Sequence, residues 1–209
     1  MLQTATPSML PLLLLVVLGL TSRVVHAAEP VFSFDAPTFF GSGCPAGSLE
    51  VITAADGQSV SMLFSQFAAA TSGAATRERK SCNLAVPVTL KPGFSVGVYR
   101  VDYRGNAYVP SVRGAAVDFS ASYFFAGATG PTYAKRWGPA TDESILITNK
   151  LSVSAVVWSP CGAATTFRVN AAVTASKSSP RDADPQIAID TTDVTVNDSM
   201  RFYVTYKTC

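Results

Sequence analysis

The chain has 209 residues, of which 48% are hydrophobic and 14% are charged, and its formal net charge at pH 7 is +2. This length suits one domain with a sizeable hydrophobic core. Because the sequence has no extended basic run, nucleic acid is not expected as a partner.

Residues 1–27 have the features of a signal peptide. Met9–Leu20 is a single apolar run, shorter than a transmembrane helix and typical of the hydrophobic region of a signal sequence. Val25 and Ala27 provide small residues at the −3 and −1 positions of a cleavage site. A signal anchor is the alternative. The sequence therefore predicts a secreted, extracellular domain over residues 28–209 without a membrane span.

The only histidine of the chain, His26, lies within this leader. A mature domain without imidazole cannot carry a Ser-His-Asp or Cys-His nucleophile, a His-ligated metal or a histidine general base. No metal and no cofactor are therefore expected.

The first strands are predicted around Asp56-Gly57, a dipeptide that favours a β-hairpin between Leu49–Thr53 and Ser59–Phe64. Upstream, Gly41-Ser42-Gly43-Cys44-Pro45 lacks the Lys-Ser/Thr of a phosphate-binding loop and is expected to form a tight turn anchored by a disulfide. Residues 65–75 and the basic run at 77–80 are predicted to form loops.

The central prediction is a second antiparallel hairpin, which turns at Lys91-Pro92-Gly93. From Leu84 to Leu90, apolar residues alternate with small or polar ones, as in a half-buried strand. From Phe94 to Tyr103 the chain is rich in β-branched and aromatic residues, which favour a strand.

Further strands are predicted at Val112–Phe125, Lys150–Trp158, Thr165–Ala175, Ile187–Val196 and Met200–Tyr206. Gly127–Glu143 contains many turn residues and is predicted as a long loop. About ten strands separated by turns, with no amphipathic helix, indicate an all-β fold, a single-domain antiparallel β-sandwich.

The mature domain contains four cysteines, which are Cys44, Cys82, Cys161 and Cys209. An even number in a secreted chain predicts two disulfides, and three pairings are possible. Order along the chain favours Cys44–Cys82 and Cys161–Cys209, which would hold the last strand in place. A thiol nucleophile or a cysteine zinc site is the alternative, although the sequence has no CxxC spacing.

Several short motifs occur together in one order. They are Gly41-Ser42-Gly43-Cys44-Pro45, Phe64-x-x-Phe67, a basic run into Cys82-Asn83-Leu84, Pro92-Gly93-Phe94, Val101-Asp102-Tyr103-Arg104-Gly105, Tyr123-Phe124-Phe125-Ala126-Gly127 and Ser159-Pro160-Cys161-Gly162. Over about residues 36–209, this set resembles the secreted family known as domain of unknown function 4360. The resemblance implies a small secreted β protein with four bridging cysteines, and it implies no particular activity.

Two pairs of residues are candidates for ligand binding. Asp102 and Arg104 lie two positions apart on a predicted strand, so they share a face and can form an ion pair or recognise a ligand. Tyr133 and Trp137 fall in the predicted long loop, where exposed rings can stack on sugars or anchor a protein. Packing over the end of the sandwich is the preferred interpretation for these two rings, and ligand binding is the alternative.

Two polar motifs lie near the C-terminus. Asn197-Asp198-Ser199 is an N-glycosylation sequon, which predicts a glycoprotein. Asp182 and Asp184 could supply oxygen ligands to Ca²⁺, but a solvated loop without metal is the preferred interpretation.

Without histidine, a hydrolase would need a pair of carboxylates, and no pair is marked out by its spacing. We therefore expect a non-enzymatic binding or structural module of the cell surface or wall, with a glycan or an extracellular protein as its partner. One alternative is a glycan-active hydrolase that uses two carboxylates. The other is a secreted effector or inhibitor that binds a protein.

Overall fold

The structure is a computed structural model, which describes residues 31–55, 57–152, 155–162, 164–189 and 200–209. The predicted signal peptide, His26 and the sequon at Asn197 lie outside these residues. Among the residues described, no helix has the length and apolar character that crossing a membrane would require.

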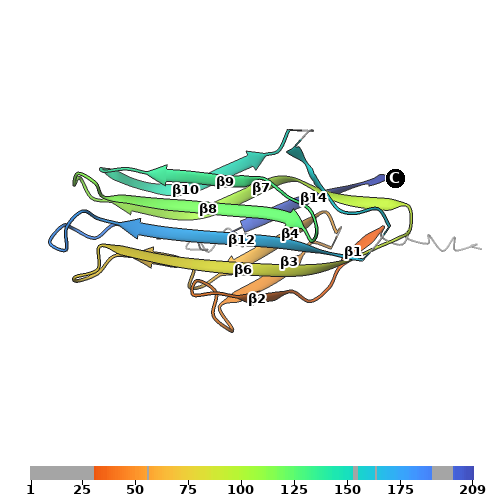
Figure 1. Ribbon diagram of the computed structural model, residues 1–209, viewed down its shortest axis with the longest axis horizontal. Coiled ribbons are helices and arrows are strands. Elements are labelled where there is room, and N and C mark those ends of the chain that lie inside the picture. Colours follow the sequence, from red (N-terminus) through yellow and green to blue (C-terminus); the bar gives the residue numbers. More distant parts are fainter. Residues whose placement is uncertain (1–30, 56, 153–154, 163, 190–199) are drawn as a thin grey trace, which may run out of the picture.

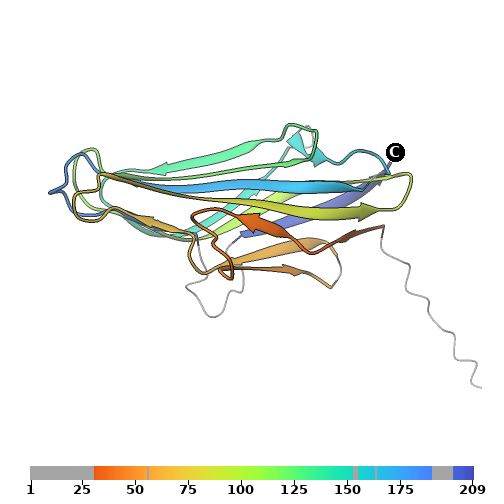
Figure 2. The ribbon, with the colours of Figure 1, turned by 60° about the horizontal axis from the view of Figure 1, so that its bottom comes forward.

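Two antiparallel sheets pack face to face, and their strands run along the long axis of the molecule (Figures 1 and 2). The first sheet contains β1 (Phe32–Phe34), β2 (Thr38–Phe40), β6 (Arg77–Leu90), β8 (Ala116–Phe125), β9 (Thr132–Trp137) and β12 (Thr165–Ser176). The second contains β3 (Leu49–Thr53), β4 (Ser59–Phe64), β5 (Ala68–Ala70), β7 (Phe94–Val109), β10 (Thr141–Lys150), β11 (Val157–Trp158), β13 (Gln186–Ala188) and β14 (Met200–Thr208). The predicted all-β sandwich is thus confirmed.

The long strand β7 organises the second sheet. One edge of β7 pairs with β14 and β13, and the other pairs with β11 and β10. The described residues form fourteen strands, more than the ten predicted. Three-residue strands such as β1 and β5 are too short to show alternation, and the predicted loop 127–143 contains β9 and the start of β10.

The hairpin predicted around Lys91-Pro92-Gly93 is wrong, because β6 and β7 belong to different sheets. The turn carries the chain across the sandwich, at the same end as the C-terminus (Figure 1). Inward-facing Val86 and Val88 of β6 and Val96 and Val98 of β7 are all buried in one core. The other predicted hairpin is correct, since β3 pairs with β4.

The core between the sheets is rich in aromatic side chains. Phe167 and Phe202, from opposite sheets, pack edge to face with ring centroids 5.2 Å apart. A fully buried side chain of this size contributes about 1.5–3 kcal/mol. Tyr103 is also fully buried, and burial raises the pKa of its hydroxyl far above the usual range.

Both disulfides form in the pairing that chain order favours. Cys44–Cys82 ties the glycine-rich turn to β6, and Gly41 lies so close to β6 that a Cβ atom would come 2.1 Å from the carbonyl oxygen of Ser81. This turn is therefore structural, as predicted.

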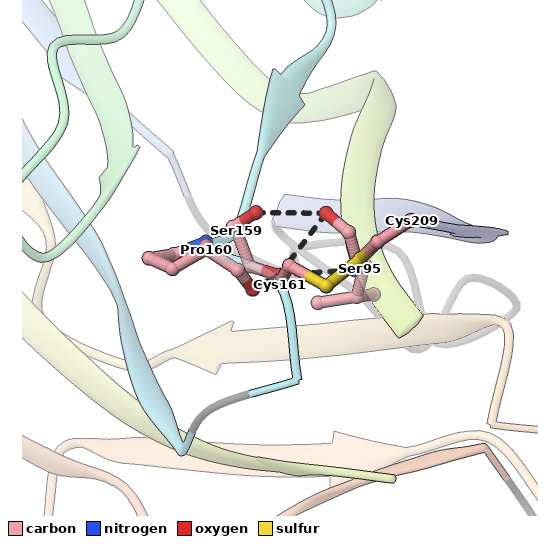
Figure 3. The surroundings of a disulfide bond; sticks show 6 residues. Ser95, Ser159, Pro160, Cys161 and Cys209 are labelled. Atoms are coloured by element: carbon pink, nitrogen blue, oxygen red, sulfur yellow. Dashed lines mark hydrogen bonds between the residues drawn. A yellow bond between two sulfur atoms is a disulfide. The ribbon is translucent and has the colours of Figure 1, made fainter. Parts of the chain in front are cut away.

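Cys161–Cys209 ties the segment after β11 to the end of β14 (Figure 3). Beside it, the Ser95 hydroxyl donates to the carbonyl of Ser159 at 2.7 Å, and the N–H of Cys209 donates to the carbonyl of Gly93 at 2.9 Å. The last strand is thus held at its end, as predicted.

The basic run 77–80 was predicted to be a loop but forms the start of β6 and pairs with β12. Residues 77–80 are all charged and include no apolar residue, so they lack the pattern of a half-buried strand. Lys80 and Glu78 form an ion pair at 3.0 Å on the sheet surface.

Candidate functional site

A β-bulge in β7 exposes two adjacent side chains on the outer face of the second sheet. Arg100 lies opposite Tyr203 of β14 and Val98 lies opposite Val204, so Tyr99 has no partner on β14. Val98 and Val101 on either side are fully buried. Tyr99 and Arg100 therefore both point outward, a re-aiming of side chains that bulges commonly produce.

Arg100 forms a two-pronged ion pair with Asp102. Its Nε donates to Oδ1 at 2.9 Å and its Nη2 donates to Oδ2 at 2.5 Å. The sequence allows an ion pair between Asp102 and Arg104, but the two-pronged partner of Asp102 in the structure is Arg100. Arg104 lies further along the same face, opposite Leu146 of β10.

Asp102 is held in its charged form although only 6% of it is exposed. Burial by itself raises the pKa of Asp102, but hydrogen bonds from Arg100, Thr148 and Tyr203 and the charge of Arg100 outweigh it. The pKa of this carboxyl thus lies below its ordinary value. Asp102 in turn raises the pKa of the Arg100 guanidinium, mainly through their hydrogen bonds.

Two tyrosines stand beside this ion pair. The ring centroids of Tyr99 and Tyr203 are 6.3 Å apart and their planes are tilted by 54°. The Arg100 guanidinium lies 4.4 Å from the centroid of the Tyr203 ring, and that of Arg201 lies 6.0 Å from it. These cation–π contacts fix the orientation of Tyr203, while Tyr99 remains 39% exposed.

The tyrosines border a depression of about 500 Å³ on the outer face of β3, β4, β7 and β14. We call it the tyrosine depression, and its lining residues are Ile52, Ala54, Gln58, Ser59, Ser61, Tyr99, Arg201 and Tyr203. Its polar side is ordered, because Arg201 Nε donates to Ser61 Oγ at 2.9 Å. Its apolar side is open, with Ile52 44% exposed.

A third aromatic ring lies further along the same face. Trp158 of β11 pairs with Gly97 of β7 and covers it, so that a Cβ atom on Gly97 would lie 2.7 Å from the indole. The ammonium of Lys207 lies 4.1 Å from the ring centroid. The outer face of the second sheet therefore presents three aromatic rings, and two of them, Tyr203 and Trp158, are contacted by cationic side chains.

Sequence reasoning missed Tyr99, Tyr203 and Trp158 as surface features. Strict alternation along β7 places Tyr99 on the same side as Val101 and Tyr103, which are buried. The sequence does contain a signal of the bulge, which is a break in the alternation. The inward-facing Val96 and Val98 are followed by an inward-facing valine at position 101, where strict alternation requires position 100. Such a shift of three positions marks a bulge.

Tyr133 and Trp137 were expected in a loop, and this placement is wrong because both lie in β9. Trp137 is 4% exposed, and its indole N–H donates to the Glu143 carboxylate. Tyr133 is half-buried and stacks on Tyr103 with ring centroids 5.2 Å apart. Neither ring lies near the tyrosine depression, whose lining comes from the other sheet.

Asp182 and Asp184 surround a lysine of their own loop. The Lys177 side chain is 1% exposed, and its ammonium donates to Asp184 Oδ1 at 2.7 Å and to the carbonyls of Pro180 and Asp182 at 3.2 Å each. The carboxylate of Asp182 accepts the N–H of Ser179 at 2.8 Å. Among the described residues, no group of three or more acidic, histidine or cysteine side chains could hold a metal.

We expect Lys177→Met to lower the free energy of unfolding by about 2 kcal/mol, because the carbonyls of Pro180 and Asp182 and the carboxylate of Asp184 lose their buried donor. Hydrogen bonds from Lys177 and Thr71 hold the pKa of Asp184 below its ordinary value. The part of the stabilisation that comes from the Asp184 carboxylate is therefore present at neutral pH and is lost as the pH falls below about 4, whereas the bonds to the carbonyls remain. Urea titrations at pH 7 and pH 3 should show a smaller variant effect at pH 3.

The control for this experiment is Arg113→Met, which removes an exposed cation. We expect it to change stability by less than about 0.5 kcal/mol at either pH. A Lys177→Met protein as stable as the native one at pH 7 would contradict a stabilising role for the buried ammonium.

Comparisons with known proteins place the chain among relatives. A family model described as "Domain of unknown function (DUF4360)" matches residues 32–209. An "Uncharacterized secreted protein" of Arthroderma benhamiae is 31% identical over 139 residues, which make up 65% of this chain and 56% of that protein. The chain thus spans little more than half the length of this relative.

One solved structure, TmCBM61 in complex with beta-1,4-galactotriose, is also similar. Its TM-score is 0.28 and its sequence identity is 14%, over 83% of this chain and 90% of that chain.

Proposed function

The chain belongs to the family of the domain of unknown function DUF4360, as its motifs indicated, and we propose that it is a secreted module that binds carbohydrate in the tyrosine depression. Two disulfides fit an extracellular protein, and the curated relative is named as secreted. We expect the signal peptide over residues 1–27 to deliver it there.

The observation that carries this proposal is the pair of tyrosines fixed beside a depression on a rigid sheet face. Sugar rings present apolar C–H faces that stack on aromatic rings, and their hydroxyls bond to polar side chains. Tyr99 and Tyr203 offer the rings, and Arg201 and Ser61 offer the polar groups. Because both tyrosines lie on paired strands, little ordering is needed on binding.

Asp102 has a supporting role in this proposal. It fixes the Arg100 guanidinium, which in turn packs on the Tyr203 ring. Arg100 and Asp102 therefore position Tyr203, and we propose that they act through that ring instead of through direct sugar contact.

The composition of the depression favours binding over hydrolysis. Glycosidases use two carboxyl groups about 5–10 Å apart on either side of the scissile bond. Among the described residues that line the tyrosine depression there is no Asp or Glu. The nearby Asp102 is engaged by Arg100 and is kept charged, so it is not a proton donor at neutral pH.

We expect Tyr99→Ala and Tyr203→Ala each to weaken carbohydrate binding by about tenfold or more, because each removes a stacking ring. An array of neutral and acidic polysaccharides, probed with the secreted protein, identifies the ligand. Isothermal titration with an oligosaccharide of that ligand then gives the affinity of each variant.

Tyr108→Ala is the matched control. Tyr108 is 38% exposed on the outer face of the same strand, but it does not line the depression. Its loss should leave the affinity unchanged. A native protein that binds no polysaccharide on the array, or a Tyr108 variant as weak as the Tyr99 variant, would contradict the proposal.

A further inference from the structure

One edge of the second sheet is a long strand with an unpaired side. β10 pairs with β7 in an unbroken antiparallel register from Thr141↔Val109 to Lys150↔Arg100. Among the described residues, no strand pairs with the other side of β10. Alternate N–H and C=O groups along this strand therefore point away from the sheet, where they can pair with another strand.

The middle of this edge exposes an apolar side chain. Leu146 lies on the outer face of β10, opposite Arg104 of β7, and is 68% exposed. Acidic Asp142 and Glu143 lie towards one end of β10, and Lys150 is its last residue. The strand thus has an acidic end, an apolar centre and a basic end.

Because of this order of side chains, β10 is complementary to a second, antiparallel copy of itself. When two copies of β10 are paired about Leu146, the outer face matches leucine with leucine, Ser144 with Thr148 and Asp142 with Lys150. Each of these is a favourable cross-strand pair. A shift of two residues in either direction places Leu146 opposite Ser144 or Thr148 and separates Asp142 from Lys150.

We infer that two copies of this chain form a symmetric dimer through β10, with Leu146 at the two-fold axis. The inner face of the same register sets Ile145 against Ile147, so the seam is apolar on both sides. A parallel arrangement would place acidic ends together, so the charges select the antiparallel one. The contact is isologous, which closes the assembly at two copies and prevents fibre growth.

The two-fold axis of this dimer is perpendicular to the sheet, so the outer faces of both copies lie on one side. Both tyrosine depressions would then face the same way across one continuous sheet. If the proposed function holds, two linked sites can engage one polymer, which raises avidity over either site alone. The dimer itself does not depend on that function.

Sedimentation velocity on the secreted protein tests the dimer. Because strand-edge interfaces are small, we expect dissociation at about 10–100 µM. Leu146→Lys should be monomeric throughout, since it places two ammonium groups face to face. Ile52→Lys, at the exposed edge strand β3 of the same sheet, should dimerise like the native protein.

Charge reversal tests the register. Asp142→Lys places a lysine opposite Lys150, and Lys150→Asp places an aspartate opposite Asp142, so each single variant should weaken dimerisation by at least about tenfold. The double variant restores opposite charges and should dimerise like the native protein. A native protein that stays monomeric at several hundred micromolar, a Leu146→Lys protein that still dimerises, or a double variant no better than the single ones would overturn the inference.

Discussion

We expect replacement of both Cys161 and Cys209 by alanine to lower the free energy of unfolding by about 4 kcal/mol. The disulfide closes a loop with a sequence separation of 48 residues, and its removal returns that conformational freedom to the unfolded chain. In a domain of this size, such a loss should lower the melting temperature by about 8–16 °C. Differential scanning calorimetry of the native and double-alanine proteins measures it.

The Cys44–Cys82 disulfide provides a matched comparison. Its sequence separation is 38 residues, so loop entropy alone predicts a loss smaller by only about 0.2 kcal/mol. Cys161–Cys209, however, also anchors the end of β14, which lies between β4 and β7 in the middle of the second sheet. If removal of Cys161–Cys209 lowers the free energy of unfolding by more than this difference, the additional loss measures the contacts of β14 that depend on the anchor.

Hydrogen exchange distinguishes local from global effects. Without Cys209 bonded, the last residues of β14 should exchange rapidly, while Phe202, buried between the sheets, should exchange only by global unfolding. Equal stability of the native and double-alanine proteins, or free thiols in the native protein, would contradict the stabilising role of this bridge.

The sequence predicts the sandwich because alternation and cysteine order are local or nearly local properties. Alternating residues define which face of a strand is buried, and β6 shows this pattern from Leu84 to Leu90. They do not define the partner of the strand. A hairpin within one sheet and a turn between two sheets require the same apolar faces, so the Lys91-Pro92-Gly93 turn was assigned to the wrong arrangement.

The candidate site was harder to predict because it depends on register. Asp102 was identified as an ion-pair residue, but the bulge at Tyr99 brings Arg100 onto its face and supplies a different partner. Trp137 was assigned to a loop because turn residues surround it, and its burial arises from pairing with Val117 of β8 and from contact with Glu143. Neither the partner of Asp102 nor the burial of Trp137 can be predicted without the positions of strands that are distant in the sequence.

The loop around Lys177 shows the same limit. The sequence predicts that Asp182 and Asp184 are acidic residues of a solvated loop. Nothing nearby in the sequence indicates that the Lys177 ammonium is buried against Asp184. That burial also requires the Thr71 hydroxyl and the Gly73 carbonyl, from a loop about a hundred residues away in the chain.

We expect Gly105→Ala to lower the free energy of unfolding by about 3 kcal/mol, the upper end of the usual cost of overpacking. Gly105 lies in the middle of β7, between Ile145 of β10 and the end of β13. A Cβ atom there would lie 2.0 Å from the carbonyl oxygen of Ala188 and 2.9 Å from its carbonyl carbon. Backbone atoms of a paired strand cannot move aside as a flexible side chain can, so β13 must separate from β7.

Gly138→Ala is the control, because a Cβ atom at Gly138 meets nothing within 4 Å. We expect that variant to match the native protein within about 0.5 kcal/mol in urea titrations, which separates the loss of a glycine from the steric clash. Hydrogen exchange should also show faster exchange at Ile187 of β13 in the Gly105 variant, while β12 of the other sheet keeps its protection. Equal stability of the Gly105→Ala and Gly138→Ala proteins would show that β13 does not approach β7 as closely as the structure has it.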